Sequence, residues 1–171
     1  MRTAGDAVTV RPARPEDAPA ACAVLRRSIQ DLCRADHGDD PAVLAAWLGN
    51  KTPAQVAGWI AAPEGCLLVA EVGGMVCGVG SIGGDGRIGL NYVAPEARFR
   101  GVSTALLAAL EAWARTRGLA RCRLESTATA RRFYLARGYA EAGPPQRQMG
   151  AVGYPMAKAM AACPTPDPQP A

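Results

Sequence analysis

The sequence predicts an α+β fold built on one sheet. In the middle of the chain, three strand-type segments follow one another, joined by the glycine-containing turns 73–74 and 83–86, which is typical of an antiparallel meander. Helical periodicity fills the segment before this meander, and helix and strand patterns alternate after it. A chain of 171 residues is long enough for one domain with a continuous core and short for two.

The first third of the chain is predicted to contain one strand and three helices. Residues 7–11 alternate between apolar and polar types, as in a short strand. A helix follows Pro15 and ends near Asp36, because apolar residues recur at helical spacing between them. A second helix is expected over 41–48. A third starts after Thr52, a residue type that caps helix N-termini and is followed here by proline.

The meander and a long helix form the middle of the predicted fold. Buried-type apolar runs and the turns between them predict strands over 66–72, 75–82 and 87–93. An amphipathic helix then begins near 101–103, with leucines recurring on one face, and ends at Gly118.

The last part of the chain alternates between strand and helix. A strand is predicted over 121–126, a short helix over 128–137 and a final strand over 152–160. We expect a single domain over 1–162. Residues 163–171 have proline at every second position and are expected to be a disordered tail.

Composition argues against several classes of protein. The net charge is only +4 and the basic residues are spread along the chain, so we expect no nucleic-acid partner. No apolar run approaches the roughly 20 residues that span a bilayer, and no signal core is present. We therefore expect a cytoplasmic protein without membrane association. The six cysteines form no C-x-x-C pair and no ligand spacing with the single histidine, so no metal is expected.

Segment 91–103 joins a strand to the long helix and has the features of a diphosphate site. The first turn of a helix carries unpaired backbone N–H groups and the positive end of the helix dipole. Gly101 and the small Ser103 let a pyrophosphate approach these groups, and Arg98 and Arg100 add positive charge. No NTPase motif accompanies the segment. The pattern therefore favours a carrier whose diphosphate is held and not cleaved.

Two motifs of the chain, V-x-P-E-x-R-x-R-G-x-S and F-Y-L-A-R-G-Y, resemble those of the GNAT superfamily of acyl-CoA-dependent N-acetyltransferases. The family pattern of Arg or Gln, two residues, Gly, one residue, and Gly or Ala falls on Arg98, Gly101 and Ser103, with serine as a small departure at the last position. The resemblance covers most of the chain. It implies a mixed, strongly curved sheet of about seven strands with helices on both faces, splayed to form a cleft for acetyl-CoA.

The resemblance assigns the acetyl-CoA site to residues of both motifs. Backbone N–H groups around Val93 and Ala94 resemble the family's bulged strand, which binds pantetheine and polarises the thioester carbonyl. Where the family often has asparagine, this chain has Thr127, so the polar contact that this asparagine would make to pantetheine is not expected in the same form. The cofactor-binding residues implied are Tyr92, Val93, Ala94, Arg98, Arg100, Gly101, Val102, Ser103, Thr104, Thr127 and Ala130.

The second motif has Ala130, Tyr134, Gly138 and Tyr139 at the family's spacing. The resemblance makes Tyr134 the general acid, because a phenol of reference pKa about 10 can donate a proton to the departing CoA thiolate. The alternative is that Tyr134 and its neighbour Phe133 only pack a short helix.

The general base and the acceptor-binding residues are less well defined. In the histone-modifying branch of the family a glutamate lies six residues before the equivalent of Val93, and this chain has Arg87 there. Glu125 and Glu71 are the candidate bases, with water-relayed proton transfer as another route. His37 and Asp36 lie between the first two helices, where the family places much of its acceptor surface, and are the candidate substrate-binding residues.

The function expected is transfer of an acetyl group from acetyl-CoA to a small-molecule or peptide amine by direct attack in a ternary complex. Two alternatives stay open: an acyl-CoA-binding regulatory module that has lost catalysis, and a toxin-type acetyltransferase acting on aminoacyl-tRNA. A homodimer through the edge of the last strands is also open. The run 78–83 matches the dinucleotide fingerprint G-x-G-x-x-G, but it lies inside a hairpin strand and no helix follows it.

Overall fold

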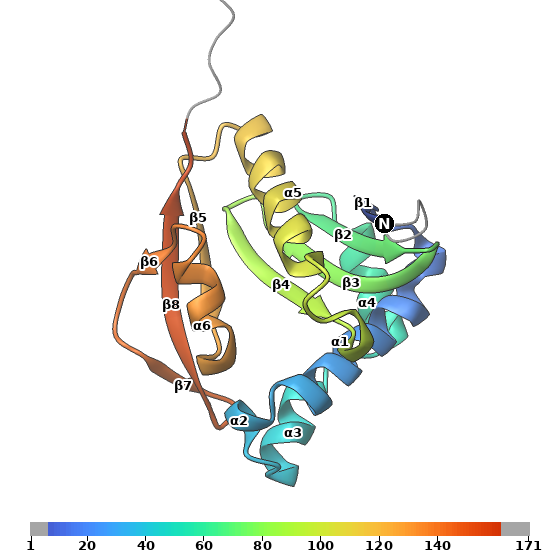
Figure 1. Cartoon of the computed structure of the whole chain (residues 1–171), viewed down its shortest axis with the longest axis vertical. Coiled ribbons are helices and arrows are strands. Elements are labelled where there is room, and N and C mark those ends of the chain that lie inside the picture. The colour runs from blue at the N-terminus through green and yellow to red at the C-terminus, as the bar shows by residue number, and fades with distance from the viewer. Residues whose placement is uncertain (1–6, 162–171) are drawn as a thin grey trace, which may run out of the picture.

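The computed structural model describes residues 7–161, which form a curved, mainly antiparallel sheet with helices on both faces (Figure 1). The strands are β1 (Val8–Pro12), β2 (Cys66–Val72), β3 (Met75–Ile82), β4 (Arg87–Val93), β5 (Arg121–Ser126), β6 (Ala140–Glu141), β7 (Gln146–Gln148) and β8 (Ala151–Ala159). The helices are α1 (Ala18–Leu32), α2 (Arg34–His37), α3 (Pro41–Leu48), α4 (Pro53–Ala61), α5 (Val102–Thr116) and α6 (Ala128–Leu135). The strand order is β1-β2-β3-β4-β5-β8-β6, and β7 pairs with β8.

The sheet opens between β4 and β5. These two strands run parallel, whereas the other strand pairs are antiparallel. Within the described part of the chain, only Arg87 and Ile88 of β4 pair with β5, opposite Arg123 and Leu124. Beyond this contact the strands separate toward their carboxyl ends, and Figure 1 shows β4 turning away from β5. Residues of both strands can therefore line the space between them.

Helix α5 packs on one face of the meander, and α1 and α4 pack on the other (Figure 1). The glycines of β3 allow the close approach of α5. A Cβ at Gly78 would lie 2.5 Å from Val102 Cγ1, and one at Gly80 would lie 3.2 Å from Leu110 Cδ1. Gly78 and Gly80 of the run 78–83 therefore serve strand-to-helix packing and not a dinucleotide.

Several elements differ from the sequence prediction. The first helix ends at Leu32 and α2 starts at Arg34, because Cys33 leaves helical geometry with φ −105° and ψ 24°. Helix α6 ends at Leu135, earlier than predicted. Within residues 7–161 the sheet has eight strands, in agreement with the prediction of about seven, and its two short, exposed strands β6 and β7 have no alternating pattern.

The remaining elements agree with the prediction to within a residue or two. Thr52 caps α4 as expected, since its Oγ1 accepts a hydrogen bond from the Gln55 N–H at 3.2 Å. None of the helices in residues 7–161 combines the length and the apolar character needed to cross a membrane. The predicted disordered tail, 163–171, lies outside the described residues.

Candidate active site

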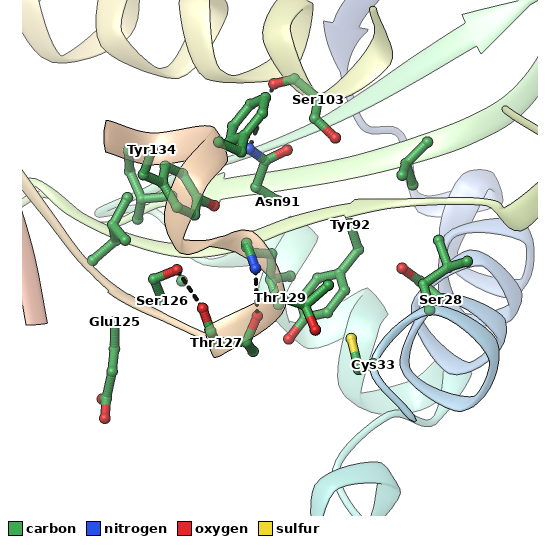
Figure 2. A pocket seen from close by; sticks show the side chains of 18 of the residues that line it. Ser28, Cys33, Asn91, Tyr92, Ser103, Glu125, Ser126, Thr127, Thr129 and Tyr134 are labelled. Carbon is green, nitrogen blue, oxygen red and sulfur yellow. Dashed lines mark hydrogen bonds between the residues drawn. The ribbon is translucent and has the colours of Figure 1, made fainter. Parts of the chain in front are cut away.

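A cleft of about 220 Å³ occupies the gap between β4 and β5. Its walls come from the ends of these two strands, from α6 and from the C-terminal part of α1. The polar side chains in it are Ser28, Asn91, Tyr92, Arg98, Ser103, Glu125, Ser126, Thr127, Thr129 and Tyr134, and all of these except Arg98 are labelled in Figure 2. Separation of the two strands thus brings together residues that are far apart in the sequence.

The end of β4 directs a backbone N–H group toward the cleft. The Ala94 N–H donates to the Cys77 carbonyl of β3 at 2.8 Å, and Tyr92 lies opposite Val79 in the same ladder. Because successive N–H groups of a strand point to opposite sides, the Val93 N–H points away from β3 and toward the gap. The prediction for Ala94 is corrected: its N–H is used within the sheet and its side chain is buried.

The N-terminus of α5 opens onto a second cavity, of about 440 Å³. Gly101 is the N-cap residue with φ 83°, and within residues 7–161 no side chain caps the helix. The first N–H groups, on Val102, Ser103 and Thr104, have no intrahelical acceptor. Arg98 is exposed and lines both this cavity and the cleft. The two cavities therefore adjoin at a positively polarised helix end.

Arg137 is a basic residue of this second cavity that the sequence analysis missed. Its Nη2 donates to Thr104 Oγ1 at 2.6 Å, and its guanidinium lies 3.7 Å from the centroid of the Phe133 ring. Arg100, by contrast, is exposed and does not line the cavity. The available signal for Arg137 was its place in the F-Y-L-A-R-G-Y motif.

Tyr134 is a buried phenol in the wall of the cleft. Its ring meets Phe133 and Tyr139 edge-on, at centroid distances of 5.1 and 5.6 Å. Burial raises the pKa of Tyr134 to about 12, although a hydrogen bond from the Asn91 side chain opposes this effect. The phenol therefore keeps its proton at neutral pH.

Asn91 is a further cleft residue that the sequence analysis did not select. Its Nδ2 donates to the Ser103 carbonyl at 3.4 Å, and Figure 2 shows Asn91 between Ser103 and the Tyr134 hydroxyl. Its Oδ1 is buried, with no hydrogen-bond partner in the described part of the chain. A buried acceptor of this kind is expected to bond to a ligand or to water.

Helix α6 begins at the cleft with two polar contacts. Thr127 caps the helix, because its Oγ1 accepts from the Ala130 N–H at 3.1 Å. Asp36 of α2 accepts from the Thr129 N–H at 3.3 Å and also from the Thr129 hydroxyl. Both carboxylate oxygens of Asp36 therefore connect α2 to α6, and Asp36 does not line the cleft.

Two other predicted residues lie away from the cleft. The His37 side chain is fully buried, with Nε2 3.1 Å from the Ile29 carbonyl and Nδ1 accepting from the Asp39 N–H at 3.1 Å. Both ring nitrogens are occupied, so the prediction of a substrate-binding histidine is wrong. Glu71 bonds to Arg11 between β1 and β2 and does not line the cleft, which removes it as a candidate base.

Glu125 lines the cleft but projects to the opposite face of β5 from its neighbours. Leu124 and Ser126 are buried, whereas Glu125 is 24% exposed and its Oε2 lies 4.0 Å from Arg87 Nη2. Figure 2 shows its carboxylate directed away from Tyr134. Oε1 is buried without a partner among residues 7–161. A carboxylate thus lies beside Arg87, the position at which the histone-modifying branch has its glutamate.

The fold and the family match are those of an acyltransferase. Residues 33–160 match the family model of the acetyltransferase (GNAT) domain, and the chain therefore belongs to this family. No curated protein sequence matches the chain.

Solved structures of several acetyltransferases are similar over most of the chain. A GCN5-related N-acetyltransferase from Rhodopseudomonas palustris has 28% identity over 88% of this chain and 94% of its own, with a TM-score of 0.79. PaiA N-acetyltransferase from Thermoplasma acidophilum, solved with coenzyme A, has 18% identity over 90% and 99%, with a TM-score of 0.74. YncA from Salmonella typhimurium, solved with acetyl-CoA, has 20% identity over 94% and 98%, with a TM-score of 0.70.

Proposed function

We propose that this protein transfers the acetyl group of acetyl-CoA to an amine by direct attack within a ternary complex. The observation that carries the proposal is the continuous path from the uncapped N-terminus of α5 to Tyr134, through the gap between β4 and β5. The structures of PaiA with coenzyme A and of YncA with acetyl-CoA support the choice of donor.

The pyrophosphate of the donor binds at the start of α5. The N–H groups of residues 102–104 and the positive helix end attract it, and Arg98 and Arg137 flank the same cavity. A Cβ at Gly101 would meet nothing within 4 Å, so the approach to these N–H groups is open. Binding therefore needs no metal ion in this proposal.

The pantetheine arm enters the gap beside β4. There the Val93 N–H donates to the thioester carbonyl and stabilises the negative charge that develops on its oxygen as the amine attacks. Thr127 and Ala130 line the other wall of the cleft, and the buried Asn91 Oδ1 is an acceptor for an amide N–H of the arm. These contacts position the carbonyl carbon for attack.

Tyr134 assists departure of the CoA thiolate. A carbon–nitrogen bond forms, the carbon–sulfur bond breaks, and the sulfur leaves with the bonding electrons. Because the pKa of Tyr134 is about 12 and that of a thiol is about 8.5, the phenol stabilises the thiolate by donating a hydrogen bond. A protonated acceptor amine loses two protons in all: the first, lost before attack, passes to Glu125 and then to solvent, and the second, lost after attack, ends on the CoA thiolate.

Glu125 is the proposed acceptor of the amine proton, through a water molecule. Its carboxylate lies at the cleft on the face opposite α5 and keeps a buried oxygen that no described residue bonds. An amine that enters from that face meets the carboxylate before it reaches the thioester.

Direct attack is preferred to a covalent acyl-enzyme because the nearby thiols are protonated. Cys33 lines the cleft, and burial raises its pKa to about 12. Burial also raises the pKa of Cys77 and of Cys122. A buried thiol with a raised pKa is a poor nucleophile at neutral pH.

A thiol-release assay with acetyl-CoA across a panel of amines tests the proposal. We expect release of the CoA thiol that depends on both the amine and the enzyme. When the concentrations of acetyl-CoA and amine are both varied, the double-reciprocal rate plots should intersect, as for a ternary complex. Tight CoA binding without release for any amine would support the regulatory module instead. Release that requires aminoacyl-tRNA would support the toxin-type alternative.

A further inference from the structure

A basic groove of about 420 Å³ lies against β5 and β8. It is lined by Arg87, Arg121, Arg123, Leu124, Glu125, Ala142, Gln146, Gln148, Pro155, Met156 and Ala157. Arg87 of β4 and Arg123 of β5 lie opposite each other in the paired part of these strands, Arg121 is the first residue of β5, and the two glutamines come from β7. Of these residues, the proposed function uses only Glu125.

The basic groove lies on the face of the sheet opposite α5. Cys122 and Leu124 of β5 are buried in the core that contains α5, and the alternate residues 121, 123 and 125 face the other way. Arg87 also lines a third cavity together with Trp59 of α4, which packs on that opposite face. The donor therefore approaches from one face and the basic groove opens on the other.

The basic groove meets the cleft at Glu125. Leu124 and Glu125 line both spaces, so a ligand in the basic groove can extend to the gap between β4 and β5. Residues 121 and 125 are four positions apart on one strand, a separation of about 13 Å. An acceptor held by the arginines reaches the gap if it spans this distance less the reach of the arginine side chains.

The charge of the basic groove is only partly balanced within the protein. Arg123 pairs with Asp85, and Arg87 lies at 4.0 Å from Glu125. The Arg121 backbone pairs with Ala159 of β8, but its guanidinium forms no hydrogen bond or ion pair with a residue in 7–161. Gln146 and Gln148 supply neutral amide donors on the facing strand. Guanidinium groups of this kind bind carboxylates in a bidentate manner and repel cations.

We propose that the basic groove binds a carboxylate of the acceptor, so that the acceptor is an amino acid or short peptide and not a polyamine. The inference rests on the proposed function. The acceptor carboxylate pairs with Arg121 and Arg87, and its amine points past Glu125 into the cleft. A polyamine would bring further positive charge to the same arginines.

Matched acceptors with and without the carboxylate test this assignment. Rates with acetyl-CoA are compared for glutamate against glutamine, and for phenylalanine and glycyl-aspartate against their amides. In each pair we expect kcat/KM to be at least about ten-fold higher for the acceptor that has the additional or free carboxylate. The amide member loses a charged hydrogen bond to the arginines, and such a bond accounts for a difference of this size. Spermidine should be a poor acceptor.

Arg121→Gln tests the residue itself. The variant should raise KM about ten-fold for the carboxylate-bearing member of each pair, with a much smaller effect on its partner and on the KM of acetyl-CoA. Arg117→Gln, which removes an exposed arginine at the end of α5 that lines neither the cleft nor the basic groove, is the matched control.

The outcomes separate the two proposals. If amines without a carboxylate, such as spermidine, are the best acceptors, or if Arg121→Gln leaves the preference unchanged, the basic groove is not the acceptor site although acetyl transfer stands. If no amine is acetylated, the proposed function fails. In that case calorimetry with glutamate on the CoA-loaded protein decides whether the basic groove binds carboxylates, and absence of binding overturns that assignment too.

Discussion

The proposed donor end of the cleft consists mainly of backbone groups, whereas the proposed acceptor end consists of side chains. At the donor end, the groups that matter are backbone N–H groups at the start of α5 and the N–H of Val93, held by a helix and a strand. At the acceptor end, they are side chains: Glu125 on β5 and the arginines of the basic groove. Backbone sites follow from local geometry, whereas side-chain sites depend on which residues the fold brings together. Substitutions at the two ends should therefore differ in kind.

The largest expected effect is at the donor end. Gly101→Glu places a carboxylate where the pyrophosphate approaches and forces a non-glycine residue into φ 83°, so CoA affinity measured by calorimetry should fall more than about 100-fold. Gly118→Glu is the matched control, because Gly118 also has a positive φ of 68° and open space, but lies after the C-terminal end of the same helix. Equal losses for both variants would mean that strain or misfolding, and not the diphosphate site, causes the effect.

The next effect is at the centre of the cleft. Tyr134→Phe removes only the hydroxyl, so CoA affinity and stability should change little while kcat falls about 10- to 1,000-fold. Tyr139→Phe, a buried tyrosine that contacts Tyr134 but does not line the cleft, is the control and should retain most of kcat. Wild-type turnover by Tyr134→Phe would leave the ring with a packing role alone.

The pH profile of the same reaction provides a further measurement. The pKa of Tyr134 is raised to about 12, so the phenol stays protonated as pH rises through 10, its ordinary range. Turnover should therefore not fall through ionisation of Tyr134 until about pH 12. An alkaline loss centred near pH 10 that is absent from Tyr134→Phe would contradict this environment.

At the acceptor end, we expect substitution of the buried His37 to affect stability and not turnover. His37→Ala leaves the Ile29 carbonyl and the Asp39 N–H without their partner, which should lower the free energy of unfolding by about 1–3 kcal/mol in a urea titration. Turnover per folded molecule should stay near the wild-type value. Arg34→Ala, on the same helix but exposed, should change stability by less than about 0.5 kcal/mol. A selective rise in the KM of the acceptor for His37→Ala would instead show that His37 contributes to substrate binding.

The smallest effect is expected for the exposed cations around the donor. Arg98→Ala should weaken CoA binding about three- to ten-fold at low ionic strength and by less at high salt, because an exposed charge contact is screened. Arg100→Ala should have a smaller effect, since Arg100 does not line the cavity at α5. Calorimetry at two salt concentrations checks both, and a loss for Arg98→Ala that is independent of salt would indicate a structural role.

Local patterns accounted for most of the fold. The meander strands β2, β3 and β4 have the predicted boundaries, because alternation, burial and glycine turns are all encoded within a few residues. The strands β6 and β7 were missed because two or three exposed residues carry no periodic signal, and they form by pairing with β8. The same locality explains why a diphosphate site at the start of α5 could be predicted from the sequence.

In the candidate site, too, residues that are close in the sequence could be predicted together, whereas contacts between distant residues could not. Arg98, Gly101 and Ser103 lie within six positions of one another, so their shared role could be predicted from spacing. Asp36 and Thr129 are 93 positions apart, and only their contact shows that the carboxylate holds α6. Likewise, His37 has the composition of a surface loop residue but is enclosed by the packing of α1, α2 and α3.

The sequence by itself determined the family and the order of the central elements, and it predicted the helix end that the proposed donor site uses, because each depends on short-range spacing and on backbone geometry. Only the tertiary structure decided which side chains face the cleft. Separation of β4 from β5 after two residue pairs places Asn91 beside Tyr134, and the alternation of β5 directs Glu125 toward the basic groove. These relations join residues from distant parts of the chain, and long-range packing sets them.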